Sequence, residues 1–221
     1  MSSAPADRPK AAERIQAAAK DLFYRHGIRA TGVEEVCRVA EATKMSLYRS
    51  YPSKDALVAA ILCEDAAVYD VWFEAVTGGL PDAIAKLRAL VEAVATKLSD
   101  PDYRGCPLLL AQAEFPDPAH PTHQLVAKHK ARMRTGLTQL AAEAGAAEPE
   151  AVGDALALLF DGAWASLPYL GSARAGEVLR QSAEAVFRLG LPRAPSALGQ
   201  SAFGSATPAP ALSSARDQTT S

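Results

Sequence analysis

The seven residues from Thr43 to Arg49, TKMSLYR, combine two cations, three hydroxyl groups and one thioether. Lysine and arginine bind phosphate oxygens, and hydroxyls bind phosphates or the polar edges of bases. A methionine offers an apolar surface of the kind that meets a thymine methyl. Leu47 and Tyr51 are four residues apart and would turn toward a core if the segment is helical. The polar residues would then share the outer face of a short helix.

The neighbouring residues predict the elements that position this helix. Val33, Val36, Cys37 and Ala40 recur at helical spacing and predict a preceding helix over residues 32–40. We expect Thr31 and Glu34 to form a capping box at its start, Thr43 to cap the polar helix and Ser53 to cap a longer one from Lys54. Two short helices joined by a tight turn are typical of a helix-turn-helix, whose second helix enters the major groove of DNA. The alternative is a three-helix packing unit with a solvated polar face.

Matching positions then spread over about residues 10 to 60, and this pattern resembles the DNA-binding domain of the TetR (tetracycline-repressor-like) family of bacterial transcriptional regulators. The matching residues are Ile15, Ala18, Ala19, Leu22, Phe23, Gly27, Thr31, Val36, Cys37, Ala40, Leu47, Tyr48, Tyr51, Lys54 and Leu57. Glu41 stands where the family usually has glycine in the turn, so the turn either tolerates a Cβ or has altered geometry. Cys37 replaces the usual alanine and is interpreted as a small core residue.

The resemblance implies which side chains meet DNA. Lys44, Met45 and Ser46 would approach the bases. Thr31, Thr43, Tyr48 and Lys54 would hold phosphates, and Arg49 could do either. The implied protein is a regulator, most simply a repressor, that binds a palindromic double-stranded DNA operator and releases it when a small-molecule effector occupies the C-terminal part. Two alternatives are a ligand-independent architectural DNA-binding protein and a helical protein that has lost DNA binding.

Composition and charge fit a helical protein of the cytoplasm. Of 221 residues, 49% are hydrophobic, which is ample for a core, yet no apolar run reaches the roughly 20 residues of a membrane span. The first residues, MSSAPADRPK, lack the hydrophobic region of a signal peptide. Three cysteines without paired spacing argue against disulfides. The net charge of -2 divides into +3 for residues 1–60 (10 Lys+Arg, 7 Asp+Glu) and -5 for the rest (13 and 18), so the N-terminal end is the basic one.

The whole chain predicts an all-α fold of about nine helices, because alanine and leucine dominate and β-branched runs are absent. The expected helices span residues 10–26, 32–40, 43–50, 54–77, 82–99, 106–114, 117–145, 148–167 and 172–190. We expect a disordered segment at 1–9, the helix-turn-helix domain at 10–53, a helical effector-binding and dimerisation domain at 54–191, and a disordered Ser/Ala/Pro-rich tail at 192–221.

The last two expected helices each carry an apolar stripe. Its members are Leu156, Leu159, Phe160, Ala163 and Trp164 in one helix and Val178, Leu179, Ala183, Val186 and Phe187 in the other. Ordinary packing within the monomer would explain them. The family resemblance instead implies a homodimer in which these helices form a four-helix interface. Apart from Trp164, these residues are our predicted interface.

Candidate residues for an effector cavity are Trp72, Phe73, Cys106, Phe115, Met133, Phe160, Trp164 and Tyr169, with simple core packing as the alternative for each. We expect no cofactor and no metal: His120, His123, His129 and Cys106 lack a spacing typical of a metal site. Cys106 could respond to oxidation if a helix N-terminus lowers its pKa. No phosphate loop, nucleophile elbow or paired-carboxylate motif is present, so the sequence does not predict an enzyme.

Overall fold

The computed structural model describes residues 10–192, which form helices joined by turns and contain no strand. The nine helices of this range are α1 (Ala11–His26), α2 (Val33–Val39), α3 (Lys44–Ser50), α4 (Lys54–Thr77), α5 (Ala83–Lys97), α6 (Pro107–Ala113), α7 (Pro121–Glu143), α8 (Pro149–Leu170) and α9 (Ser172–Gly190). This confirms the predicted all-α fold, with a three-helix head and a larger helical body. The predicted segment 1–9 and, beyond Pro192, the predicted tail lie outside the described residues.

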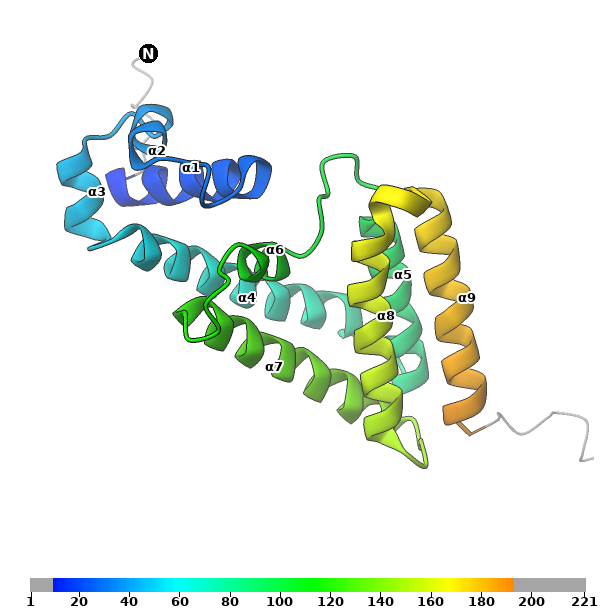
Figure 1. Ribbon diagram of the computed structural model, residues 1–221. Helices are drawn as coiled ribbons and strands as arrows, with labels where there is room; N and C mark the ends of the chain where they lie inside the picture. The colour runs from blue at the N-terminus through cyan, green and yellow to red at the C-terminus, as the bar shows by residue number, and fades with distance from the viewer. Residues whose placement is uncertain (1–9, 193–221) are drawn as a thin grey trace, which may run out of the picture.

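The head and the body are connected by α4. Figure 1 shows α1, α2 and α3 gathered at one end, with α4 running from α3 past α6 and into the body. In the body, α5, α8 and α9 lie side by side, and α7 packs against α8. Helix α4 therefore joins the head to the body.

Several helix ends follow their sequence signals. The Thr43 hydroxyl accepts the N–H of Ser46 at 3.1 Å, and the Ser53 hydroxyl accepts the N–H of Ala56 at 3.0 Å, so both predicted caps are confirmed. The expected capping box at α2 is wrong. Gly32 is the N-cap residue, and the Thr31 hydroxyl instead donates to the carbonyl oxygen of Gly27 at 2.8 Å. Thr31 therefore closes the turn between α1 and α2.

The start of α7 also differs from the prediction at Asp117-Pro118. The Asp117 carboxylate accepts the N–H of Ala119 at 2.9 Å and forms a separate turn, and the helix begins at Pro121. His120 is its N-cap and accepts the N–H of Thr122 at 3.3 Å. Two successive proline signals compete here, and the second one starts the helix.

Two hydrophobic clusters fill the described chain, and the head cluster does not end at residue 53. Besides the inner faces of α1 to α3, it includes Leu57, Val58, Ile61 and Leu62 of α4 and Cys106, Leu108, Ala111 and Val126 of the body. Helix α6 thus packs into the same cluster as helices α1 to α3 of the head. Cys37 is 6% exposed within it, which confirms its interpretation as a core residue.

The body cluster corrects the predicted dimer interface. Six predicted interface residues are buried within the monomer: Leu156, Phe160, Ala163, Leu179, Ala183 and Phe187. Leu159 and Val186 are partly buried against the same cluster, and Val178 is partly buried. The most hydrophobic stripe of each helix is buried by packing among α5, α7, α8 and α9. Removing this apolar surface from water stabilises the monomer. Within residues 10–192, no helix is long and apolar enough to span a membrane.

Candidate DNA-binding site and ligand cavity

Helix α3 presents a continuous exposed face. Leu47 is fully buried, and Tyr51, just after the helix, donates its hydroxyl to the side-chain oxygen of Gln16 at 2.6 Å. The opposite face leaves Met45 79% exposed and Tyr48 48% exposed, with Lys44 and Arg49 exposed beside them. The helix therefore offers an apolar tip, a phenol and two cations on one side.

The turn before α3 has an unusual backbone. Glu41 has a φ of 48°, and it is the one residue other than glycine with a positive φ in the described chain. This left-handed conformation answers the question raised by the missing glycine: the turn keeps the geometry that favours glycine although a glutamate occupies it. Arg14 of α1 supports the turn, since its guanidinium donates to the carbonyl oxygens of Ala40 at 3.0 Å and Glu41 at 3.1 Å.

Ion pairs modulate the charge around the exposed face of α3. The Lys44 ammonium binds the carboxylate of Glu34 on α2, and this contact raises the pKa of Lys44 and lowers that of Glu34. Arg38 pairs with Glu35 at 2.6 Å. Both pairs are exposed, so their ions exchange partners at low cost. Lys44 can leave Glu34 for a phosphate or a base edge, whereas Arg49 carries no ion pair among the described residues.

Two residues predicted to hold phosphates have other contacts. Thr31 is 4% exposed and its hydroxyl is bonded to Gly27. The half-buried Lys54 ammonium donates to the carbonyl oxygens of Ile28 and, at 2.7 Å, Thr31. Burial lowers the pKa of Lys54. These contacts do not support a direct phosphate role for either side chain; both residues fix the α1–α2 loop that leads to the reading helices.

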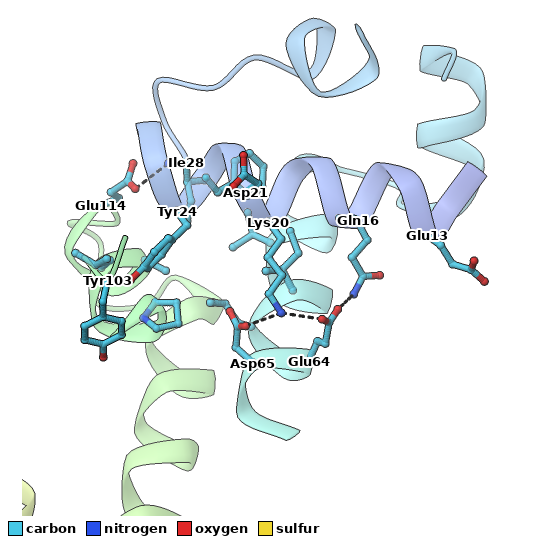
Figure 2. Close-up of a pocket in the computed structure, with 18 of the residues that line it drawn as sticks. Glu13, Gln16, Lys20, Asp21, Tyr24, Ile28, Glu64, Asp65, Tyr103 and Glu114 are labelled. Atoms are coloured by element: carbon cyan, nitrogen blue, oxygen red, sulfur yellow. Dashed lines mark hydrogen bonds and ion pairs between the residues drawn. The ribbon is translucent and has the colours of Figure 1, made fainter. Parts of the chain in front are cut away.

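A cleft of about 800 Å³ separates α1 of the head from α4 and α6 of the body. Figure 2 shows Lys20 of α1 between Glu64 at 2.7 Å and Asp65 at 2.9 Å, both on α4. At the other end of the cleft, Glu114 accepts the backbone N–H of Ile28, and its second oxygen accepts that of Arg29. Polar bonds thus bridge head and body at both ends of the cleft.

Tyr24 adds a third bridge from α1 to the body. Its hydroxyl accepts the backbone N–H of Arg104 at 2.7 Å and donates to the carbonyl oxygen of Gly105 at 3.0 Å. Burial raises the pKa of Tyr24, so the phenol stays protonated and keeps donating. The residue that follows Gly105 is Cys106, which lines an inner cavity. The head is therefore bonded to the segment that forms one wall of that cavity.

The inner cavity has a volume of about 160 Å³ and lies inside the body. Five of the residues predicted for an effector cavity line it: Trp72, Cys106, Met133, Phe160 and Trp164. The other three do not. The Phe73 ring packs on Gly136, Phe115 stacks on His120 with ring centroids 3.9 Å apart, and Tyr169 is 76% exposed at the end of α8. The apolar pattern of the sequence does not show whether a residue lines the cavity or packs elsewhere in the core.

The three histidines of the body have separate surroundings. His120 caps α7, His123 bonds through Nε2 to the carbonyl oxygen of Phe115 at 2.7 Å, and His129 is buried against Tyr69. No three metal-ligating side chains gather anywhere in residues 10–192. Cys106 is buried at the start of α6, 7% exposed. A redox role of this thiol stays a prediction.

Sequence reasoning missed the residues that hold the reading head in place. Arg14, Tyr24 and Glu114 each bond to backbone groups distant in the sequence, across separations of 26, 81 and 86 residues. Nothing in the local pattern marks such contacts.

Comparisons with known proteins agree with this geometry. Residues 15–61 match the sequence family described as bacterial regulatory proteins, tetR family, and residues 83–181 match the tetracyclin repressor-like C-terminal domain. The structure is similar to SCO4454, a TetR-family transcriptional regulator from Streptomyces coelicolor, with a TM-score of 0.78 and 32% identity over 81% of this chain and 95% of that one.

Two further relatives are more distant. The HTH-type transcriptional regulator YjdC of Escherichia coli is 26% identical over 151 residues, which are 68% of this chain and 79% of YjdC. The reduced form of E. coli NemR shares the fold at 21% identity, with a TM-score of 0.72 over 79% of this chain and 95% of NemR. The matches cover the head and the body together. The chain therefore belongs to the TetR family and is a DNA-binding transcriptional regulator.

Proposed function

We propose that the protein is a homodimeric repressor of the cytoplasm that binds a palindromic operator through α3 and releases it when a small molecule occupies the body. The exposed face of α3 is the single observation that carries this proposal. Met45 and Tyr48 are exposed with Lys44 and Arg49 on a helix whose other face is buried. In this reading, Lys44, Met45 and Ser46 meet base edges, and Thr43, Tyr48 and Arg49 hold phosphates.

An unpaired apolar face on α8 and α9 supports the homodimer. Leu158, Gly162, Ala165 and Tyr169 recur at helical spacing on the outer side of α8, with Leu158 74% and Tyr169 76% exposed. On α9, Leu189 is 91% exposed, and Val186 is partly exposed one turn before it. Exposed leucines over adjacent helices are typical of protein interfaces. Small residues between them allow close approach of two helices. We propose this outer face, which shares only Val186 with the predicted stripe, as the surface that pairs two copies.

The bridges between head and body support regulation by a ligand. A ligand in the inner cavity contacts the wall at Cys106, and the adjacent Gly105 is bonded to Tyr24 of the head. A useful switch requires that the ligand bind the DNA-incompetent arrangement more tightly, by about 1–3 kcal/mol. Displacing a few of these bonds is worth that amount.

The experiment is selection of bound sequences from a randomised duplex library by the full-length protein, followed by fluorescence anisotropy on the recovered DNA. We expect an inverted repeat bound about a thousandfold more tightly than random DNA. Met45→Ala should lose at least about fivefold of that preference, at one base pair of each half-site. Val71→Ala is the matched control, because it shortens an exposed apolar side chain on α4 rather than on α3.

Recovery of no repeated sequence, with equal and salt-sensitive binding to all DNA, would overturn the proposal. Placing the recovered repeat between a promoter and a reporter tests the sign, and repression is expected.

A further inference from the structure

The cleft between the head and the body has the size of a ligand-binding site. Its volume of about 800 Å³ lies within the roughly 300–1,000 Å³ of pockets that bind small molecules. Apolar side chains line part of it, including Ile61 and Leu62 of α4 and Leu110 of α6. Leu110 is 39% exposed, so part of this apolar wall is open to water. A molecule with an apolar body would be stabilised by covering it.

Acidic side chains outnumber basic ones around the cleft. Among the described residues that line it, the acidic ones are Glu13, Asp21, Glu64, Asp65 and Glu114, and the basic ones are Lys20 and Lys97. Arg25, which does not line the cleft, pairs with Asp21 at 2.7 Å. An excess of negative charge remains after this pair is counted. The cleft therefore attracts cations more strongly than anions.

One ammonium group is shared by two carboxylates at the α4 wall of the cleft. Lys20 lies 2.7 Å from Glu64 and 2.9 Å from Asp65, as Figure 2 shows. The Asp65 side chain is 11% exposed, and burial raises the pKa of its carboxyl group. The three charged groups together carry one negative charge. A second cation beside Glu64 and Asp65 would neutralise it.

Two tyrosine rings add an aromatic surface to the cleft. Tyr24 of α1 and Tyr103 of the body both line it, and Figure 2 shows their rings near each other. The Lys97 ammonium lies 5.2 Å from the centroid of the Tyr103 ring. Ring faces attract cations and pack against other rings. These two residues therefore favour a ligand that combines a positive charge with an aromatic body.

We propose that the cleft between α1 and α4 binds an organic cation with an aromatic body, whose ammonium group lies beside Glu64 and Asp65 and shares these carboxylates with Lys20. Glu64 lines the cleft but not the inner cavity, so changing it distinguishes the two spaces. Neither this site nor its test depends on the proposed function.

The test compares three probes that share a naphthalene ring: 2-naphthylmethylamine, which is an ammonium ion at neutral pH, the neutral 2-naphthylmethanol and the anion 2-naphthoate. Binding to the full-length protein without DNA is measured by ligand-observed NMR titration. We expect the ammonium ion to bind about tenfold more tightly than the alcohol, and the carboxylate to bind more weakly than the alcohol. In Glu64→Gln, which keeps the side-chain shape and removes the charge, the preference for the ammonium ion should fall to within about threefold.

Glu74→Gln is the matched control, because it makes the same substitution at an exposed glutamate of α4 that does not line the cleft. It should leave all three affinities unchanged. Equal binding of the ammonium ion and the alcohol to the unmodified protein, a preference that survives Glu64→Gln, or no binding of any probe would each overturn the proposal.

A second variant locates the ring of the ligand. Ala17 of α1 is exposed and lines the cleft from the head side, so a tryptophan there takes up part of its space. Ala17→Trp should weaken binding of the ammonium ion and of the alcohol alike, by at least about fivefold. Unchanged binding of both would contradict a site in this cleft. Urea denaturation of each variant establishes that it is folded.

Discussion

The carboxylate of Glu114, at the end of α6, accepts the backbone N–H of Ile28 at 2.8 Å, a contact that joins the body to the loop between α1 and α2. Its second oxygen accepts the N–H of Arg29 at the same distance. The ammonium group of Lys54 donates to the carbonyl oxygen of Ile28. Ile28 is therefore held by its N–H from the body and by its carbonyl from α4. Any shift of α6 pulls on the loop that positions the reading helices.

We predict that Glu114→Ala loosens the head and uncouples it from the body. Two charge-assisted hydrogen bonds are lost and a partly buried N–H is left unpaired, so the free energy of unfolding should fall by about 1–3 kcal/mol. Urea denaturation measures this. Glu74→Ala, at an exposed glutamate on α4, is the control and should change it by less than about 0.5 kcal/mol. Equal stability of the two variants would show that the Glu114 bonds do not hold the head.

Lys54 and Arg49 should separate structural from DNA-binding cations. Lys54→Met keeps the side-chain length but leaves two carbonyl oxygens without their donor, so we expect a loss of about 1–2 kcal/mol in unfolding free energy and little change in the salt dependence of DNA binding. Arg49→Ala should leave stability almost unchanged and flatten the slope of log affinity against log salt by about one. Anisotropy titrations at several salt concentrations measure the slopes. A flattened slope in Lys54→Met would return that lysine to the phosphate-binding set.

Local signals made the helices predictable, whereas contacts between distant residues were not. Thr43, Ser53 and the glycines that end helices act within one turn of the chain, so the bounds of α3, α4 and α9 follow from the sequence itself. Asp117 failed as a start signal because a second proline, Pro121, competes with it four residues later. The left-handed φ of Glu41 shows that a motif can override the preference of its residue.

The candidate site divides in the same way. The exposed face of α3 follows from helical periodicity and the burial of Leu47, so the exposure of these side chains could be predicted, whereas their contact with DNA stays a prediction. Periodicity also marked Leu156 and Phe160 as apolar, yet it could not tell which of two neighbouring surfaces they would meet. Both residues are buried in the core of the monomer, and the less hydrophobic outer stripe that includes Leu158 is exposed. The carbonyl contacts of Thr31 and Lys54 could not be predicted, because an exposed hydroxyl or ammonium and one bonded to a carbonyl oxygen look alike in a sequence.

The burial of His129 predicts a pH dependence of stability. Burial lowers its pKa below the ordinary 6.5, with Lys130 and Arg132 acting in the same direction and Asp70 and Asp161 opposing. As the pH falls below about 6.5, the unfolded chain takes up a proton that the folded protein does not, so stability is lost between that pH and the lower folded pKa. His129→Gln removes this titration and should lose less stability between pH 7.5 and about 5 than the unmodified protein.

Urea denaturation at a series of pH values between these limits measures the difference. The exposed His26, changed to Gln, is the control and should retain the pH dependence of the unmodified protein. If His129→Gln also retains it, His129 is protonated as readily in the folded protein as in the unfolded chain.

Leu158 gives the sharpest test of the dimer. Its side chain is 74% exposed at the middle of α8, so an aspartate there is tolerated in a monomer. In a four-helix interface, two aspartates would be desolvated near each other across the two-fold axis, and an unpaired buried charge costs several kcal/mol. We expect Leu158→Asp to shift the sedimenting species from dimer to monomer at micromolar concentration with its helix content unchanged. Val71→Asp, at a 72% exposed valine on α4, should remain a dimer.

The monomer should also bind a single operator half-site more weakly than the dimer binds the full repeat, because a second copy of α3 no longer contributes to binding. A dimeric Leu158→Asp would place the pairing surface elsewhere on the molecule.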